Sequence, residues 1–507
     1  MSQSQSHQVK EVDPEGVASK GLKANTIGLW GATVIGLAST APVYSLAATI
    51  GFVVAYAGTQ APGFMILAFI PMLLTAYAYR EMNAVIPDAG TTFTWGTKGL
   101  GPHIGWMGGW AVAVSGIVFL ANAAQVCGAY FFDIIGRHDL ASNKTWVVVV
   151  GIAIVSLMAW IAYRGLEIGE WVQTVLVILQ YIALAMLAVA CLWAVYHGNG
   201  QDGSIKPAWD WLNPFAAGIS FVDFSKAVLL CLFIYWGWDA VLAVNEETKD
   251  PEKTPGRAAL IATVLLLLAY VGTTMATVSY AGTGDTGTGL NNPDVQENVF
   301  MAVAEPLLGT WGTTFILVVT LISAAAAAMT TILPTARGTL AMAVYKALPD
   351  KFAAVHPKYK TPGFSTMVAT IIGLLYYVIM TFVSENLLED TITSIALAIA
   401  FYYAITSFAC IAYFRKDLFT DTRSFFFKFL FPLLSGISLF AAFVISAVQM
   451  WNVDYGETVL FGIGGVFVIG VGALLIGVVL MFIWQAMAPP FFRGETLTTD
   501  TPVLVED

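Results

Sequence analysis

Long apolar stretches follow one another along almost the whole chain, and they limit the fold more than any other feature. A helix needs roughly 20 apolar residues to cross a bilayer. Only α-helices and closed barrels satisfy all their backbone groups in lipid, and these stretches are too long for barrel strands. The sequence therefore predicts an all-α membrane protein with twelve transmembrane helices. Their expected ranges are 26–57, 62–80, 104–135, 145–163, 170–195, 224–244, 257–281, 309–336, 364–384, 391–413, 429–451 and 458–486.

The composition agrees with a protein that crosses the membrane many times. Hydrophobic residues make up 58% of the chain and charged residues only 11%, whereas a soluble domain carries roughly 25% charged residues. The net charge of −10 and the lack of a basic stripe give no indication of nucleic acid binding. The cysteines lie inside apolar stretches, without the spacing of a metal site or a disulfide framework. We therefore expect membrane lipid around the chain, no nucleic acid partner and no bound metal.

The basic residues predict which side of the membrane each loop faces. An even number of crossings places both termini on the same side. Of the 23 Lys and Arg residues, all but Arg137, Lys144, Lys206 and Lys226 fall on that side. Cytoplasmic loops carry an excess of Lys and Arg. We therefore expect a multi-pass protein of the plasma membrane with both termini in the cytoplasm.

The sixth stretch, residues 224–244, contains a carboxylate beside a weak point in the helix. Asp239 lies close to Gly237, and the interiors of the other apolar stretches contain no Asp, Glu, Lys or Arg. A charge in hydrocarbon costs at least about 2.5–3.5 kcal/mol, so it usually faces protein or water and marks a functional path. Asp239 is therefore a candidate for proton coupling or for binding a substrate amine. The alternative is a structural role, with hydrogen bonds to the backbone of the first or seventh span.

The first stretch contains a similar weak point near its middle, at residues 36–42. Small residues surround Pro42, which lacks a backbone donor and clashes with the carbonyl four residues back. Interruptions at matching places in two halves are the best sequence indication of a binding site in an inverted-repeat transporter. Since the first and sixth spans are five apart, the predicted halves are spans one to five and six to ten.

This interpretation is a five-plus-five inverted repeat with two additional C-terminal helices, and it divides the chain into six parts. These are the cytoplasmic N-terminal tail (1–25), the first repeat (26–195), an extracellular loop (196–223), the second repeat (224–414), the last two spans (415–486) and the cytoplasmic C-terminal tail (487–507).

Four stretches of the chain resemble the amino acid–polyamine–organocation (APC) family of secondary transporters. They are the first interruption at 36–42, the end of the second span with its loop at 79–110, the stretch 233–257 around Asp239, and the stretch 335–362. Together they cover roughly residues 20–415. The resemblance implies the five-plus-five fold, with the substrate bound between the unwound parts of the first and sixth spans.

Individual positions can be carried over from this resemblance. It implies that four residues lie at the first interruption and four at the second. Phe233, in the second group, takes the place of the family's gating aromatic residue. The first group is Ala38, Ser39, Thr40 and Ala41, and the second is Phe233, Tyr235, Trp236 and Gly237.

Helix physics gives the same arrangement a reason. A half-helix that begins after an interruption points free N–H groups and a positive dipole end at an anion. The half-helix before it ends in carbonyls that accept from an ammonium group. We therefore expect a transporter, not an enzyme, that moves an amino acid or related organic amine by alternating access. The alternative is a polyamine or other organic-cation importer, which would need more carboxylates than Asp239.

The means of energy coupling stays open. Several proton-coupled members of the family carry a lysine in the fifth span, where this chain has Gln180. Glutamine cannot take up a proton near neutral pH. The remaining options are a proton carried by Asp239, sodium held by first-span carbonyls with Ser323, exchange, or uniport. Asn122 and Gln125 in the third span are further candidates to line the cavity or to bond between helices.

Five charged residues lie at the expected cytoplasmic ends of spans. They form either a solvated face or a network that closes the path to the cytoplasm. They are Arg80, Glu81, Glu246, Glu247 and Arg337.

Overall fold

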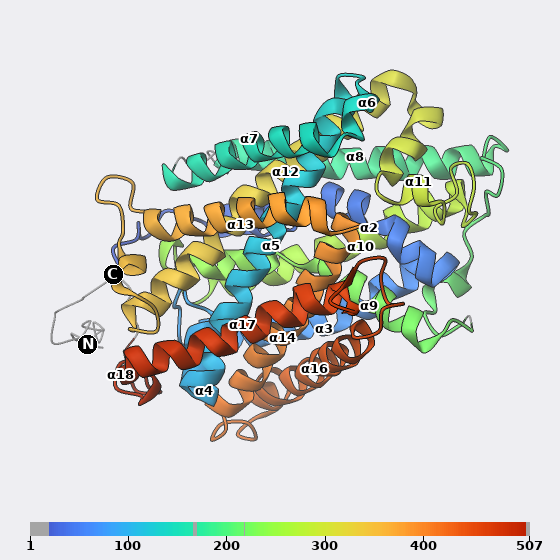
Figure 1. The fold of residues 1–507 in the computed structure, drawn as a ribbon. Helices are drawn as coiled ribbons and strands as arrows, with labels where there is room; N and C mark the ends of the chain where they lie inside the picture. Colours follow the sequence, from blue (N-terminus) through green and yellow to red (C-terminus); the bar gives the residue numbers. More distant parts are fainter. Residues whose placement is uncertain (1–19, 166–169, 217, 503–507) are drawn as a thin grey trace.

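The computed structural model describes residues 20–165, 170–216 and 218–502 (Figure 1). Within these ranges the chain is almost entirely helical, and eleven segments are long and apolar enough to cross a membrane. The first segment, Leu29–Asn83, contains three helices and covers both of the first two predicted spans. The all-α membrane fold is confirmed, while the count of twelve and the inverted repeat stay predictions.

The helices and strands follow in this order. They are α1 (Leu29–Thr40), α2 (Pro42–Ala57), η1 (Gly58–Gln60), α3 (Ala61–Asn83), α4 (Thr92–Leu100), α5 (Pro102–Ile134), α6 (His138–Ala141), α7 (Lys144–Tyr163), α8 (Glu170–Tyr196), η2 (Trp209–Leu212), α9 (Phe221–Tyr235), η3 (Trp238–Glu247), α10 (Thr254–Ala281), α11 (Pro293–Gln296), α12 (Val299–Val344), η4 (Asp350–Ala353), α13 (Gly363–Val383), α14 (Leu387–Tyr413), α15 (Thr422–Ser424), η5 (Phe425–Leu430), α16 (Phe431–Met450), β1 (Val459–Leu460), β2 (Ile463–Gly464), α17 (Gly465–Met487) and α18 (Pro489–Phe492).

The long helices lie side by side, and α5 crosses the bundle obliquely (Figure 1). Helices α5, α12 and α14 contribute many buried side chains to the centre, including the small-residue run Ala324–Ala328 of α12. Small residues let helices approach closely in a membrane. At Gly116 of α5 the approach is so close that the side chain of Thr335 leaves no room for a Cβ atom.

The outer helices present apolar side chains to the surroundings. Helices α7, α8, α13 and α17 carry large exposed hydrophobic residues along their lengths, as a lipid-facing surface requires. Examples are Val149, Leu157, Ile178, Ile182, Ile371, Leu375, Ile379, Ile476, Val479 and Ile483.

Two of the membrane segments are interrupted near their middles, as the sequence predicts. Helix α1 ends at Thr40, Ala41 has the left-handed angles φ 49° and ψ 66°, and α2 begins at Pro42. Proline fits there because the first residue of a helix needs no N–H. The interruption is shorter than the resemblance implies, since residues 38–40 stay helical and only Ala41 departs.

The second interruption separates α9 from η3. Helix α9 ends at Tyr235, Trp236 is extended, and Gly237 has φ 115° and ψ −18°. Residues that carry a Cβ atom rarely adopt such a positive φ, so glycine is the residue that suits this turn. From Trp238 the chain continues as a tighter 3₁₀ helix rather than an α-helix.

Candidate substrate site between two interrupted helices

The two interruptions touch each other. A Cβ atom added to Gly237 would lie 2.8 Å from the carbonyl carbon and oxygen of Ser39 and from the backbone nitrogen of Thr40. Backbone therefore meets backbone, with no side chain between them. Both the positive φ and this close approach require glycine at position 237.

Several backbone groups at the interruptions have partners within the protein. The Ser45 hydroxyl donates to the carbonyl of Thr40 at 2.6 Å, and the Ser45 N–H donates to the carbonyl of Ala41 at 2.9 Å. At the end of α9, the Tyr270 hydroxyl donates to the carbonyl of Ile234 at 2.8 Å. Capping of this kind holds a helix end in place where regular hydrogen bonding stops.

A small cavity lies beside the contact between the interruptions. Its volume is about 10 Å³, which suits roughly one water molecule. Its lining combines short hydroxyl side chains, two aromatic rings and one carboxylate. The lining residues are Ser39, Val112, Trp236, Gly237, Asp239, Ala240, Thr331, Pro334, Thr335 and Tyr402. An amino acid does not fit this volume, so the cavity is closed to a molecule of that size in this structure.

Asp239 is tied to α14 by a short chain of hydrogen bonds. The Tyr402 hydroxyl donates to Asp239 Oδ2 at 3.1 Å, and Trp236 Nε1 donates to Tyr402 Oη at 2.5 Å. The Asp239 carboxylate thus accepts a hydrogen bond from a hydroxyl of α14. The structural role considered from the sequence predicted instead that it would bond to the backbone of the first or seventh span. Tyr402 was missed because tyrosines are frequent in these helices and its spacing carries no signal.

The predicted site residues divide into two groups. Ser39, Trp236, Gly237 and Asp239 line the cavity. The others, Ala38, Thr40, Ala41, Phe233 and Tyr235, are buried in the surrounding core and are not part of the lining. Sequence reasoning did not assign six of the lining residues to the site: Val112, Ala240, Thr331, Pro334, Thr335 and Tyr402.

The predicted polar residues of α5 bond to neighbouring helices. Asn122 accepts a hydrogen bond from the Tyr44 hydroxyl, and its Nδ2 donates to Thr391 Oγ1 at 2.7 Å. Gln125 Oε1 accepts from the Tyr377 hydroxyl at 3.1 Å. Neither residue lines the cavity. These hydrogen-bond partners lie on α2, α13 and α14, which agrees with the interhelical alternative that the sequence left open.

Gln180 and Ser323, predicted for separate reasons, form a pair. The Ser323 hydroxyl donates to Gln180 Oε1 at 2.7 Å and accepts from the backbone N–H of Tyr44 at 3.4 Å. The pair therefore joins α8 and α12 to the first turn of α2, three residues beyond Ala41.

A comparison with known proteins now decides the family. Residues 27–482 match the family described as "Amino acid permease". The chain belongs to this family. The predicted APC resemblance is thereby confirmed.

Characterised relatives of this permease have different substrates. It is 26% identical over 361 residues to the low-affinity putrescine importer PlaP of Escherichia coli, covering 69% of this chain and 74% of that protein. It is 24% identical over 422 residues to the serine/threonine exchanger SteT of Bacillus subtilis, covering 82% and 89%. It is 25% identical over 233 residues to the branched-chain amino acid permease BcaP of Lactococcus lactis, covering 43% and 49%. By their names, these three relatives transport putrescine, serine and threonine, and branched-chain amino acids.

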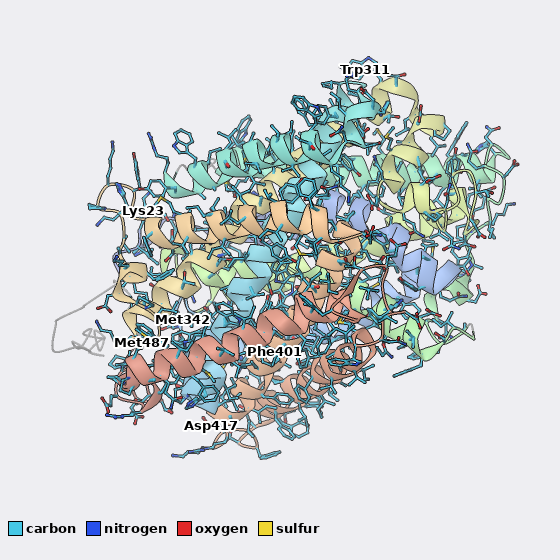
Figure 2. All side chains as sticks on the ribbon, in the orientation of Figure 1. Lys23, Trp311, Met342, Phe401, Asp417 and Met487 are labelled. Atoms are coloured by element: carbon cyan, nitrogen blue, oxygen red, sulfur yellow. The ribbon has the colours of Figure 1, made fainter. Side chains whose placement is uncertain are left out.

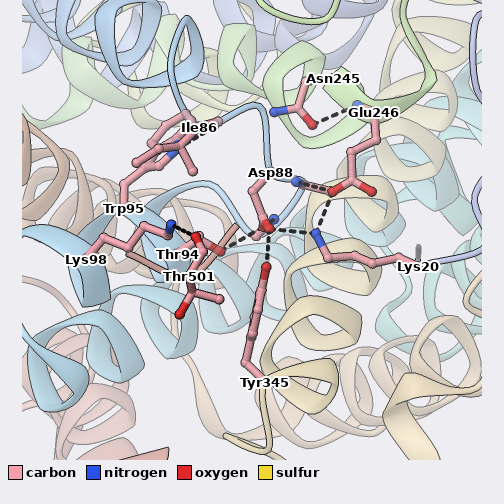
Figure 3. Close-up of polar contacts among 12 residues, drawn as sticks. Lys20, Ile86, Asp88, Thr94, Trp95, Lys98, Asn245, Glu246, Tyr345 and Thr501 are labelled. Carbon is pink, nitrogen blue, oxygen red and sulfur yellow. Dashed lines mark hydrogen bonds and ion pairs between the residues drawn. The ribbon is translucent and has the colours of Figure 1, made fainter. Parts of the chain in front are cut away.

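A buried ion-pair cluster joins three segments of the permease that are far apart in the sequence (Figure 3). Lys20 Nζ lies 2.7 Å from Asp88 Oδ2 and 2.5 Å from Glu246 Oε1. Asp88 also accepts from the hydroxyls of Tyr345 at 2.8 Å and Thr94 at 2.7 Å. We call Lys20, Asp88 and Glu246 the Lys20 cluster. It joins the segment before α1, the loop before α4 and the end of η3.

The electrostatics favour the charged forms of two members of the cluster, Lys20 and Asp88. Burial alone would raise the pKa of Asp88, but the Lys20 ammonium and the hydrogen bonds from Thr94 and the Gly90 N–H lower it below its usual value. Burial would likewise lower the pKa of Lys20, whereas the charges of Asp88 and Glu246 raise it. Lys20 and Asp88 thus form an ion pair rather than two neutral groups.

The five charged residues predicted at the cytoplasmic ends do not form one network. Glu246 belongs to the Lys20 cluster, Glu247 pairs with Arg337 at 2.6 Å, and Glu81 pairs with Arg80 at 2.7 Å and with Arg423. Lys20 and Asp88 were missed because a tail lysine and a loop aspartate have no local pattern that predicts pairing. The one available signal was that Asp88 lies inside the family-like stretch 79–110.

Proposed function

We propose that this permease is a secondary active transporter that moves an amino acid or related organic amine across the plasma membrane by alternating access. The observation that carries the proposal is the contact between Gly237 and the backbone of Ser39, beside a cavity that holds Asp239. Two interrupted helices that touch at mid-length bring helix ends of both polarities to one place.

A zwitterion suits such a place. The first turns of α2 and η3 point N–H groups and positive dipole ends toward the interruptions, where they favour a carboxylate. The last turn of α1 offers carbonyls, and Asp239 offers a carboxylate, to an ammonium group. Trp236 and Tyr402 supply an apolar wall that excludes water.

Opening the cavity requires α1 and η3 to move together. The N–H groups of Thr26 and Ile27 donate to the carbonyl of Glu247 at 2.8 and 3.1 Å, and the Lys249 N–H donates to the carbonyl of Ile27 at 2.8 Å. These bonds make the start of α1 and the end of η3 one unit. In the proposed cycle, the Lys20 cluster and the Arg337–Glu247 pair hold this unit closed on the cytoplasmic side.

A polyamine or other organic cation is the second candidate substrate. The similarity to a putrescine importer favours it. A diamine needs two separated anionic partners, however, and Asp239 is the one acidic side chain among the described residues that line the cavity. An amino acid, which brings its own carboxylate to the helix ends, therefore fits the lining better.

The proposal is tested with purified full-length protein. A thermal-shift screen against amino acids and diamines, with and without sodium, identifies ligands, and counterflow in proteoliposomes then tests transport. Asp239→Asn should weaken binding of the hits, while Asp210→Asn, which changes an exposed residue of η2, serves as the matched control. Stabilisation by diamines alone would favour the second candidate, and flux without saturation or counterflow would exclude a transporter.

The coupling ion is part of the same proposal. A proton at Asp239 and sodium near the Gln180–Ser323 pair are the two positions that the contacts support. Uptake measured with an imposed proton gradient, and separately with an imposed sodium gradient, distinguishes them. Equal uptake without either gradient would favour exchange or uniport.

A further inference from the structure

A second, larger cavity lies at the end of the permease where the Lys20 cluster is found. Its volume is about 550 Å³, and it is bordered by the start of α1, the ends of α7 and η3, the last part of α12 and the loop before α13. Lys23, which contributes to its lining, is labelled in Figure 2 at this end of the bundle. It is separate from the water-sized cavity beside Gly237, with which it shares no lining residue.

The charge of this cavity is strongly unbalanced. Its basic lining residues are Lys23, Arg164, Arg337, Lys358 and Lys360, and its acidic lining residue among the described part of the chain is Glu247. Glu247 is already engaged by Arg337 at 2.6 Å. Among the described lining residues, Arg164, Lys358 and Lys360 therefore give the cavity an excess of positive charge that favours an anion.

Three of the basic side chains have no carboxylate partner in the described part of the chain. Within the described ranges, Arg164, Lys358 and Lys360 form no ion pair with a carboxylate. The Arg164 guanidinium lies 5.0 Å from the ring centre of Trp160 and 5.1 Å from that of Tyr359, so the two rings hold it in place. Its Nε is buried and has no hydrogen-bond partner in the described structure. A guanidinium held in this way can donate to two oxygens of one phosphate.

Aromatic residues indicate the depth of this cavity in the membrane. Trp30, Trp160 and Trp171 are 55%, 50% and 75% exposed, and they lie near the adjacent ends of α1, α7 and α8. Trp30 Nε1 donates to Thr174 Oγ1 at 3.1 Å, one residue beyond Gln173 of the cavity lining. Tryptophan gathers at the level of the lipid headgroups. The basic cavity therefore opens where headgroups lie.

We propose that this cavity binds the phosphate group of an anionic phospholipid, with Arg164, Lys358 and Lys360 as its ligands. Basic pockets between membrane helices on the cytoplasmic side are suited to anionic headgroups. The tryptophans favour a lipid over free phosphate as the source, because they place the opening beside the bilayer rather than in the aqueous phase alone. The bound headgroup would border Gly31 and Ile35 of α1, so it touches the unit proposed to move during transport.

The test measures lipid binding, which does not depend on the proposed transport activity. Full-length protein is purified with equal amounts of phosphatidylglycerol and phosphatidylcholine, and native mass spectrometry records which lipid is retained. The cavity variant combines Arg164→Gln, Lys358→Gln and Lys360→Gln. The matched control combines Lys249→Gln, Lys253→Gln and Lys351→Gln, three exposed lysines outside the cavity with the same change in charge.

We expect the wild type and the control to retain phosphatidylglycerol preferentially, and the cavity variant to lose this preference by at least about tenfold. The double variant Lys358→Gln with Lys360→Gln changes only exposed side chains, so it should fold even if the triple variant does not. It should lose part of the preference for phosphatidylglycerol. Equal retention by the wild type and the cavity variant, or equal loss in the control, would overturn the proposal.

A second arm distinguishes the sources of phosphate. Thermal stability is measured in neutral detergent with phosphatidylglycerol, with inorganic phosphate, and with phosphatidylcholine. Stabilisation by phosphatidylglycerol above the other two supports the lipid. If inorganic phosphate alone stabilises the wild type, and the cavity variant loses this effect, then the cavity binds a soluble anion and the assignment to a lipid is wrong. No stabilisation by either would contradict the site.

Discussion

Replacing Gly237 by alanine is the sharpest test of the contact between the two interruptions. The alanine Cβ would lie 2.8 Å from the backbone of Ser39 and Thr40, which has no flexible side chain that could move aside. The residue would also have to keep φ 115°, which costs a residue other than glycine roughly 1–3 kcal/mol. The contact adds to this strain, so the closed form should lose at least about 2 kcal/mol, or about 30-fold in its equilibrium.

Glycines elsewhere in the chain provide the control. Gly272 of α10 is exposed, and a Cβ there would meet nothing within 4 Å. Alanine at that position should leave stability unchanged or raise it by up to about 1 kcal/mol. The assay is thermal unfolding in detergent together with uptake in proteoliposomes.

We expect Gly237→Ala to insert normally, to unfold at a lower temperature than Gly272→Ala, and to lose most of its uptake. A thiol probe adds a direct reading of the closed form. Ser39 lines the closed cavity, so the thiol of the single variant Ser39→Cys should react slowly with the probe. It should react faster when Ser39→Cys is combined with Gly237→Ala. If both alanine variants unfolded and transported alike, the argument that these backbones must touch would be refuted.

The remaining predictions concern the charged and polar contacts. Asp239→Asn should insert normally but change uptake or its pH dependence, and Tyr402→Phe, which removes the hydroxyl bonded to Asp239 Oδ2, should give a weaker form of the same effect; wild-type uptake at every pH would defeat the functional role. Lys20→Gln leaves Asp88 buried without its cation, which should cost about 3–5 kcal/mol in thermal or chemical unfolding. The pKa of Asp88 is lowered in the wild type, so its contribution is present above about pH 4 and is lost only as the pH falls through the lowered value. Without Lys20, burial raises that pKa, so the stability gap between wild type and variant should narrow as the pH is lowered from 7 to 5; a constant gap would contradict this assignment. Ser323→Ala should abolish any effect of sodium on substrate affinity while the fold persists, and an unchanged sodium response would move the ion elsewhere.

The interruptions could be predicted from the sequence because their causes are local. Pro42 among small residues, and Gly237 before a carboxylate, change the backbone at their own positions whatever surrounds them. The structure adds that residues 38–40 keep their helical form and that η3 is a 3₁₀ helix. Those details depend on packing against other helices, which a single segment does not encode.

The lining of the candidate site could be predicted only in part, for the same reason. Trp236, Gly237 and Asp239 were named because they lie at the interruption itself. Thr335 and Tyr402 come from α12 and α14, and their inclusion depends on how those helices are rotated in the bundle. These helices are apolar on nearly every face, so their sequences give no amphipathic pattern that would fix the rotation.

The same limit applies to the ends of the helices. Lys20 and Asp88 are separated by 68 positions, and Lys20 and Glu246 by 226. Charge counting placed these residues on one side of the membrane but could not say which of them pair. The division of the charged residues into separate pairs became visible only in three dimensions.

An ion-pair closure has a property that an apolar closure lacks. Burying the Lys20 cluster removes its charges from water, and their mutual attraction roughly balances that loss, so the net free energy of a buried pair against its hydrated form is small. An apolar seal of the same area would favour the closed form by about 25 cal/mol per Å² and would resist opening. A closure near balance can be shifted by the 1–3 kcal/mol that a ligand typically supplies through unequal binding to two forms. In the proposed transport cycle, charged contacts at this end and backbone contact at the centre would give two forms of similar free energy, which alternating access requires.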